Sequence, residues 1–169
     1  MDGPKRSMAP AGALRPVLLI LGSLPGEASL KAQRYYAHPQ NQFWRLLGAA
    51  LGEPLGDLAY EERLAILAAR QVGLWDVVGE ARRIGSLDGA IRDVIANPLA
   101  AFVARQPQLR AIAFNGQTAA RLGRRAMGES DVALIDLPSS SPAYTLPFAD
   151  KAQRWSVLAN FAVAATVSR

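Results

Sequence analysis

The sequence predicts an α/β protein, a three-layer α/β/α sandwich around a central four-stranded parallel sheet. Four short apolar runs, each soon followed by Gly, Asn or Pro, have the length and composition of buried strands. Segments with helical spacing of apolar residues separate these runs. Strands that alternate with helices are typical of parallel pairing, with helices on both faces of the sheet.

The predicted strands span residues 17–21, 72–78, 111–114 and 132–135. The first is apolar throughout and breaks into Gly22-Ser23-Leu24-Pro25-Gly26, because Gly and Pro force the backbone out of a sheet. This loop is therefore expected at the carboxyl end of its strand. Open α/β sheets bind their ligands at that end.

The predicted helices span residues 41–51, 60–70, 97–106 and 117–126. A last helix is expected from Trp155 to Thr166, where apolar residues recur at i, i+3, i+4, i+7, i+8 and i+11. Asn97-Pro98 is a favourable helix start, with an Asn cap and Pro at the first position. Residues 85–88 predict a turn, followed by a short helix that runs to about Ile95.

The length of 169 residues fits one domain, expected over residues 16–169, with residues 1–15 as a flexible basic tail. No apolar stretch approaches the roughly 20 residues of a membrane span, and the first apolar run is too short for a signal peptide. We therefore expect a cytoplasmic monomer that does not enter membranes. The net charge of +5 comes mostly from Arg, which favours a polyanionic partner.

The chain has no cysteine and one histidine. Disulfides, thiolate zinc sites, iron–sulfur clusters and multi-histidine metal sites are therefore excluded. We expect chemistry that needs neither a metal nor a cofactor.

An aromatic segment follows the first loop: Tyr35-Tyr36-Ala37-His38-Pro39-Gln40-Asn41-Gln42-Phe43-Trp44. Aromatic rings and polar side chains beside a ligand-binding loop indicate a pocket that stacks a flat ring and reads its polar edge. A nucleobase has both features.

Several motifs together resemble the uracil-DNA glycosylase superfamily, closest to its hypoxanthine-DNA glycosylase-like branch and related to the mismatch-specific uracil glycosylases. The resemblance spans residues 16–165, and the aromatic segment is its most specific part. It implies a parallel-sheet α/β/α domain that flips a deaminated base out of DNA and hydrolyses its N-glycosidic bond. The motifs, in chain order, are residues 22–26, 35–44, 74–77, 85–88, 114–116 and 137–143.

The resemblance also implies roles for individual residues. Phe43 is expected to stack on the flipped base, unless it only fills the core at a helix start. Asp76 either reads a ring N–H or caps a loop. His38 either donates a hydrogen bond to the leaving base or bonds backbone. Four further residues are expected in the pocket: Gly22, Ser23, Leu24 and Tyr36. Among them, Ser23 is expected to have a catalytic role. The DNA backbone is expected to contact Ser139, Ser140, Ser141 and Pro142.

Two positions depart from the superfamily pattern. Leu24 stands where many members have a polar residue that positions water, and Leu137 where many have His or Asn. Neither leucine has a donor or an acceptor. The nearest polar substitute is Asn41, which we expect to orient the attacking water or to contact the flipped nucleotide.

The sequence thus predicts a monofunctional DNA glycosylase that removes uracil, and also hypoxanthine, xanthine or other deaminated bases. Two alternatives stay open: a non-catalytic protein that binds damaged or abasic DNA, and an N-glycosidase of free nucleosides or nucleotides.

Overall fold

A computed structural model describes residues 4–82 and 92–165. Its main sheet has five strands, in the order β2-β4-β3-β7-β8. The four predicted parallel strands are confirmed, and the unpredicted β2 adds an antiparallel edge. The strands are β2 (Ala11–Gly12), β3 (Leu18–Gly22), β4 (Val72–Asp76), β7 (Ala111–Asn115) and β8 (Ala133–Leu137).

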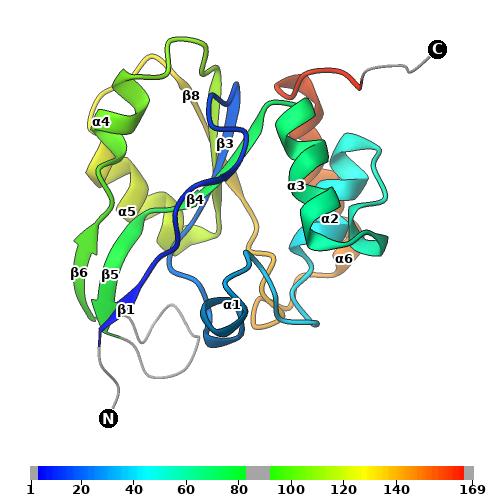
Figure 1. Ribbon diagram of the computed structural model, residues 1–169, viewed down its shortest axis with the longest axis horizontal. Coiled ribbons are helices and arrows are strands. Elements are labelled where there is room, and N and C mark those ends of the chain that lie inside the picture. The colour runs from blue at the N-terminus through cyan, green and yellow to red at the C-terminus, as the bar shows by residue number, and fades with distance from the viewer. Residues whose placement is uncertain (1–3, 83–91, 166–169) are drawn as a thin grey trace.

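Helices cover both faces of this sheet, which confirms the three-layer sandwich. Figure 1 shows α2, α3 and α6 on one side and α4 and α5 on the other. The helices are α2 (Phe43–Leu51), α3 (Tyr60–Ala69), α4 (Leu99–Ala104), α5 (Gln117–Met127) and α6 (Phe148–Trp155).

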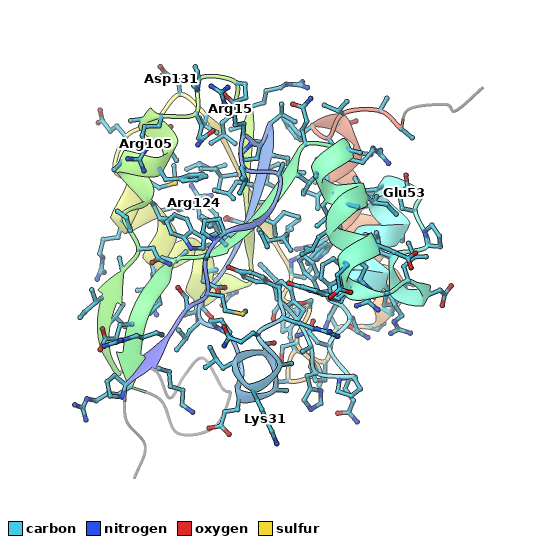
Figure 2. The ribbon with its side chains drawn as sticks, in the orientation of Figure 1. Arg15, Lys31, Glu53, Arg105, Arg124 and Asp131 are labelled. Atoms are coloured by element: carbon cyan, nitrogen blue, oxygen red, sulfur yellow. The ribbon has the colours of Figure 1, made fainter. Side chains whose placement is uncertain are left out.

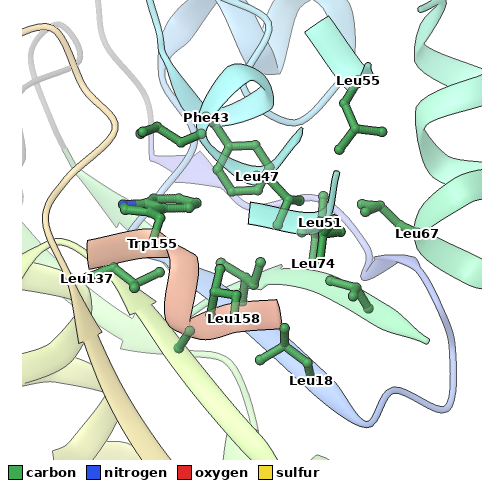
Figure 3. Packing of buried hydrophobic residues seen from close by; sticks show 14 of the residues in the cluster. Leu18, Phe43, Leu47, Leu51, Leu55, Leu67, Leu74, Leu137, Trp155 and Leu158 are labelled. Carbon is green, nitrogen blue, oxygen red and sulfur yellow. The ribbon is translucent and has the colours of Figure 1, made fainter. Parts of the chain in front are cut away.

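Most of the core lies in two clusters because side chains of the buried strands alternate between the faces of the sheet. Leu18 and Ile20 of β3 join the cluster under α2, α3 and α6. Leu19 and Leu21 join the cluster under α4 and α5. Figure 3 shows the first cluster, in which Leu18 lies near Leu158.

The flexible tail predicted for residues 1–15 is wrong for the part that the structure describes. Strand β1 (Lys5–Arg6) pairs with β5 (Val78–Arg82), and β2 pairs with β4. Between them, the carbonyls of Met8 and Ala9 accept hydrogen bonds from the indole of Trp75 and the hydroxyl of Tyr35. Pairing with distant strands fixes a segment whose own composition is that of a tail.

The short helix expected up to Ile95 is also wrong, since β6 (Arg92–Ala96) is a strand. It pairs antiparallel with β5 (Val78–Arg82), which pairs with β1, so that the three form a second small sheet. The turn expected at residues 85–88 lies outside the described residues. Strand pairing outweighs the weak helical preference of residues 92–95.

Two further differences concern helices. The C-terminal helix α6 ends at Trp155, where the predicted helix begins, and a 3₁₀ helix follows over Ser156–Asn160. Helix α1 (Glu27–Ala32) was not predicted. It lies directly after the loop at residues 22–26, beyond the end of β3 (Figure 1). A second 3₁₀ turn covers Leu55–Asp57.

Candidate active site

A cavity of about 450 Å³ opens at the carboxyl ends of the parallel strands. The residues that end three of these strands, Gly22, Asp76 and Asn115, all contribute to its wall. Its other lining residues come from the segments that follow β3 and β8: Ser23, Leu24, Pro25, Gly26, Ala28, Ser29, Tyr35, Tyr36, His38, Asn41, Ser139, Ser140, Ser141, Pro142, Ala143 and Tyr144. Every predicted site residue except Phe43 therefore lines one cavity.

Phe43 does not face the cavity, so its predicted contact with a base is wrong. Its side chain is fully buried, and the ring of Tyr36 lies flat against it with centroids 3.7 Å apart. Trp44 and Trp155 meet Phe43 edge to face. Figure 3 shows Phe43 beside Trp155 in the core. Phe43 is the first residue of α2, whose buried face also carries Leu46 and Leu47, and this helical pattern directs it inward.

Tyr36, rather than Phe43, is the aromatic residue that borders the cavity next to α2. Tyr36 lines the cavity and Phe43 supports its ring from behind. Its backbone has φ 54°, a left-handed conformation that turns the chain sharply before His38. An aromatic ring held flat between core and cavity is a ready stacking surface.

Gly22 lets two polar groups approach the end of β3. A Cβ atom at this position would lie 2.7 Å from Asp76 Oδ1 and 2.8 Å from the Tyr36 hydroxyl. The carboxylate of Asp76 and the hydroxyl of Tyr36 thus converge on one strand end. Asp76 is buried beside Tyr35. Burial of the Tyr35 hydroxyl, followed by the negative charge of Asp76, raises the pKa of Tyr35.

The Asn41 side chain lies between helix α2 and the loop after β8. Its Oδ1 accepts the backbone N–H of Phe43 at 3.0 Å and the hydroxyl of Ser140 at 2.8 Å. Because a backbone N–H can only donate, the oxygen and nitrogen of this amide are assigned without ambiguity. Both lone pairs of Oδ1 are in use, so Asn41 can serve the cavity only with its Nδ2 amino group, as a donor.

The loop after β8 carries the four residues expected to contact DNA. Ser140 is buried and bonded, whereas Ser139 and Ser141 are half-buried and Pro142 is exposed. The loop is tied to α2 by the backbone bond from Gln42 N–H to the Ser140 carbonyl at 3.0 Å. Only part of the expected DNA-contacting set is therefore accessible.

Asn115 lies in the motif at residues 114–116, to which the sequence assigned no role in the site. Its side chain exchanges two hydrogen bonds of 2.9 Å with Ser140, one with the backbone N–H and one with the hydroxyl. The position at the end of a predicted strand, directly before Gly116, was the available signal, because strand ends border the site in this architecture.

His38 lies at the exposed rim of the cavity. Its Nδ1 accepts the backbone N–H of Gln40 at 3.1 Å. In the neutral ring the proton is therefore on Nε2, which makes His38 a potential donor to a ligand.

Leu24 lines the cavity and packs on Val78 and Ala81, while Leu137 lies in the core. Both are buried apolar side chains. Neither leucine adds a polar group to the site, whose polar side chains include Asn41, His38 and Asp76.

Lys151 of α6 binds the loop after β8. Its buried ammonium donates to the Ser141 carbonyl at 3.2 Å and to Gln42 Oε1 at 3.0 Å. Among the described residues no carboxylate lies within 4.0 Å of it. Burial lowers the pKa of this amine.

The described residues include no group of three His, Asp or Glu side chains placed to hold a metal ion. In the same part of the chain, no helix has the length and apolar character needed to cross a bilayer.

Comparisons with known proteins agree with this geometry. The family model "Uracil DNA glycosylase superfamily" matches residues 9–161. A hypoxanthine DNA glycosylase of Methanosarcina acetivorans is 46% identical over 129 residues, which cover 75% of this chain and 79% of the relative. A hypoxanthine DNA glycosylase of Methanosarcina barkeri is 38% identical over 141 residues, 82% of this chain and 87% of the relative.

A solved structure shows the same fold. The chain is similar to the solution NMR structure of a candidate uracil DNA glycosylase from Methanosarcina acetivorans, with a TM-score of 0.80 and 38% identity. The match covers 92% of this chain and 96% of the other. This chain therefore belongs to the uracil DNA glycosylase superfamily and is a DNA N-glycosylase, a hydrolase that acts on DNA.

Proposed function

We propose that this enzyme excises hypoxanthine from DNA, and uracil as a second substrate, and so initiates base excision repair. The observation that carries the proposal is the convergence of Tyr36, Asp76 and the donor Asn41 on one cavity at the strand ends. The names of the two relatives support hypoxanthine as the first base to test.

The polar groups of the cavity fit the edge that deamination creates. Hypoxanthine and uracil both present a carbonyl next to a ring N–H, whereas adenine and cytosine present an amino group next to an unprotonated ring nitrogen. The Asp76 carboxylate accepts a ring N–H, and the Asn41 amino group or His38 Nε2–H donates to a carbonyl. Adenine would set its ring-nitrogen lone pair against the carboxylate, which disfavours binding of the undamaged base.

Stacking supplies affinity without selecting one base. A flipped base on the cavity face of Tyr36 would extend the stack that Tyr36 forms with Phe43. A base–aromatic stack contributes about 1–3 kcal/mol, which offsets part of the unstacking that flipping requires. Purines and pyrimidines both fit such a surface.

Bond cleavage places negative charge on the base and positive charge on the sugar. Water forms a bond to C1′ as the bond between C1′ and the base nitrogen breaks, and one proton of the water ends on the released base. The products are a free base and an abasic site. Asn41 Nδ2 is the donor best fixed to hold the water or the base in this step, since the protein holds its amide oxygen from two sides.

The test uses end-labelled oligonucleotides that carry hypoxanthine, uracil, xanthine or the unmodified base, as single and double strands. After incubation with the enzyme, alkali cleaves any abasic sites. We expect cleavage at hypoxanthine, slower cleavage at uracil, and none at adenine or cytosine. Cleavage at uracil without cleavage at hypoxanthine would refute the proposed substrate order.

The same experiment separates the alternatives. Salt-sensitive binding without strand cleavage would identify a DNA-damage binding protein, and release of base from free deoxyinosine alone would identify a nucleosidase.

Asn41→Ala tests the site, and Ser130→Ala is its control. Ser130 is exposed and precedes β8. Helix α1 borders the cavity, and Figure 2 shows its residue Lys31 at the opposite end of the molecule from Asp131, the neighbour of Ser130.

A further inference from the structure

We infer that Ser140 and Asn115 are positioning residues that lock the amide of Asn41, through a one-way chain of hydrogen bonds, with its amino group turned to the substrate. The inference rests on the proposed function, because it gives these two residues a part in the same excision reaction. Both residues are buried, with exposed fractions of 1% for Ser140 and 7% for Asn115.

The direction of the chain is set at Asn115. The backbone N–H of Ser140 donates to Asn115 Oδ1 at 2.9 Å, so the other end of that amide, Nδ2, must be the donor. Asn115 Nδ2 donates to Ser140 Oγ, also at 2.9 Å. Asn115 is the last residue of the buried strand β7, which fixes its backbone in the sheet.

The second link follows from the first. Ser140 Oγ accepts a hydrogen bond from Asn115 Nδ2, and that amino group cannot accept one in return. The single proton of the Ser140 hydroxyl must therefore be donated to another acceptor. This hydroxyl donates to Asn41 Oδ1 at 2.8 Å. Phe43 N–H occupies the second lone pair of that oxygen at 3.0 Å. Among the described residues, none accepts a hydrogen bond from Asn41 Nδ2, and Asn41 lines the cavity.

This arrangement gives an amide a fixed role in a chain that has Leu24 and Leu137 where many members of the superfamily have polar residues. An amide held by one donor can rotate about its terminal torsion and present either end. Two donors on one oxygen remove that freedom before substrate arrives. Because preorganised donors need no rearrangement at the moment of reaction, fixing the amide accelerates the step that uses it.

The experiment compares Ser140→Ala with the wild-type enzyme in single-turnover excision at saturating enzyme. We expect the rate to fall about 10-fold, with an unchanged affinity for an oligonucleotide that carries an abasic-site analogue. Ser130→Ala, a surface serine far from the cavity, is the matched control. Wild-type rates in Ser140→Ala would overturn the inference.

A second readout observes Asn41 directly. In ¹⁵N–¹H spectra the side-chain amide of Asn41 is assigned by its loss in Asn41→Ala. In Ser140→Ala this pair of signals should shift and exchange faster, while the backbone spectrum of the sheet is retained. A slower rate with an unchanged Asn41 signal would show that Ser140 acts only through general stability, and would overturn the inference.

Two safeguards keep the test decisive. If Ser140→Ala does not fold, Ser140→Cys replaces it, because cysteine has nearly the volume of serine but is a weak donor. Ser140→Cys should show the same loss of excision rate. A normal rate in Ser140→Cys would refute the proposed chain of hydrogen bonds. If the wild-type enzyme releases no base from any oligonucleotide, the proposed function fails. Failure of the inference requires an active wild type, so the two failures are distinguishable.

Discussion

Replacement of Asn41 separates its two contributions, one to stability and one to the reaction. In Asn41→Ala, Phe43 N–H at the start of α2 and the buried Ser140 hydroxyl both lose their acceptor. Each loss costs about 1 kcal/mol, so the variant should unfold with about 2 kcal/mol less free energy. For a chain of this size the melting temperature should fall by roughly 4–8 °C.

Asn41→Asp is the informative partner of Asn41→Ala. It keeps an oxygen for both donors but removes the amino group and adds negative charge near Asp76 and the departing base. We expect a melting temperature close to that of the wild type and an excision rate about 10²–10³-fold lower, the usual cost of losing one preorganised donor.

Thermal unfolding and single-turnover excision of hypoxanthine measure the two quantities separately. The reasoning is refuted if Asn41→Asp excises at a near-normal rate. It is equally refuted if its rate loss merely follows a loss of stability as large as that of Asn41→Ala.

Three further perturbations test other parts of the site. Gly22→Ala places a methyl group 2.7 Å from the Asp76 carboxylate, so base excision should fall at least about 10-fold while binding of undamaged duplex stays unchanged in a gel-shift assay; normal excision would contradict the close approach. Lys151→Met should remove a pH dependence of stability. Folding lowers the pKa of Lys151 below its ordinary value, so between these two pKa values the unfolded chain binds more protons than the folded chain. The stability of the wild type should therefore rise with pH in that window, and that of the variant should not. Identical pH profiles of the two proteins in urea titrations would disprove this prediction. Tyr35→Phe removes the bond to the Ala9 carbonyl and should lower stability by about 1 kcal/mol, and an unchanged urea midpoint would count against a fixed N-terminal segment.

Three strands of the parallel sheet, β3, β4 and β7, could be predicted because they are buried on both faces. Such strands are apolar without interruption, as in residues 17–21, and the pattern depends little on their neighbours. The small sheet could not be predicted in this way. Strand β6 carries exposed Val94 and Ile95, and only its partner β5, 10 or more residues away, makes it a strand.

The site could be predicted as a set of segments but not in its internal order. The strand-end loops and the aromatic segment converge as expected. Within that segment, however, Phe43 belongs to a helix and Tyr36 to an irregular turn with positive φ, and no local pattern showed which ring would face outward. The same holds for Asn115, whose part depends on Ser140, 25 residues later.

The N-terminal segment has a consequence for how the nascent chain folds. Lys5 and Ala11 find their partners only at Ala81 and Leu74, so during synthesis each must wait for about 70 further residues before it can dock. Contacts this distant in sequence close late, because the loop between them must be ordered first. The N-terminal segment, whose Ala9 carbonyl accepts the Tyr35 hydroxyl, can therefore dock only after β4 and β5 have been synthesised.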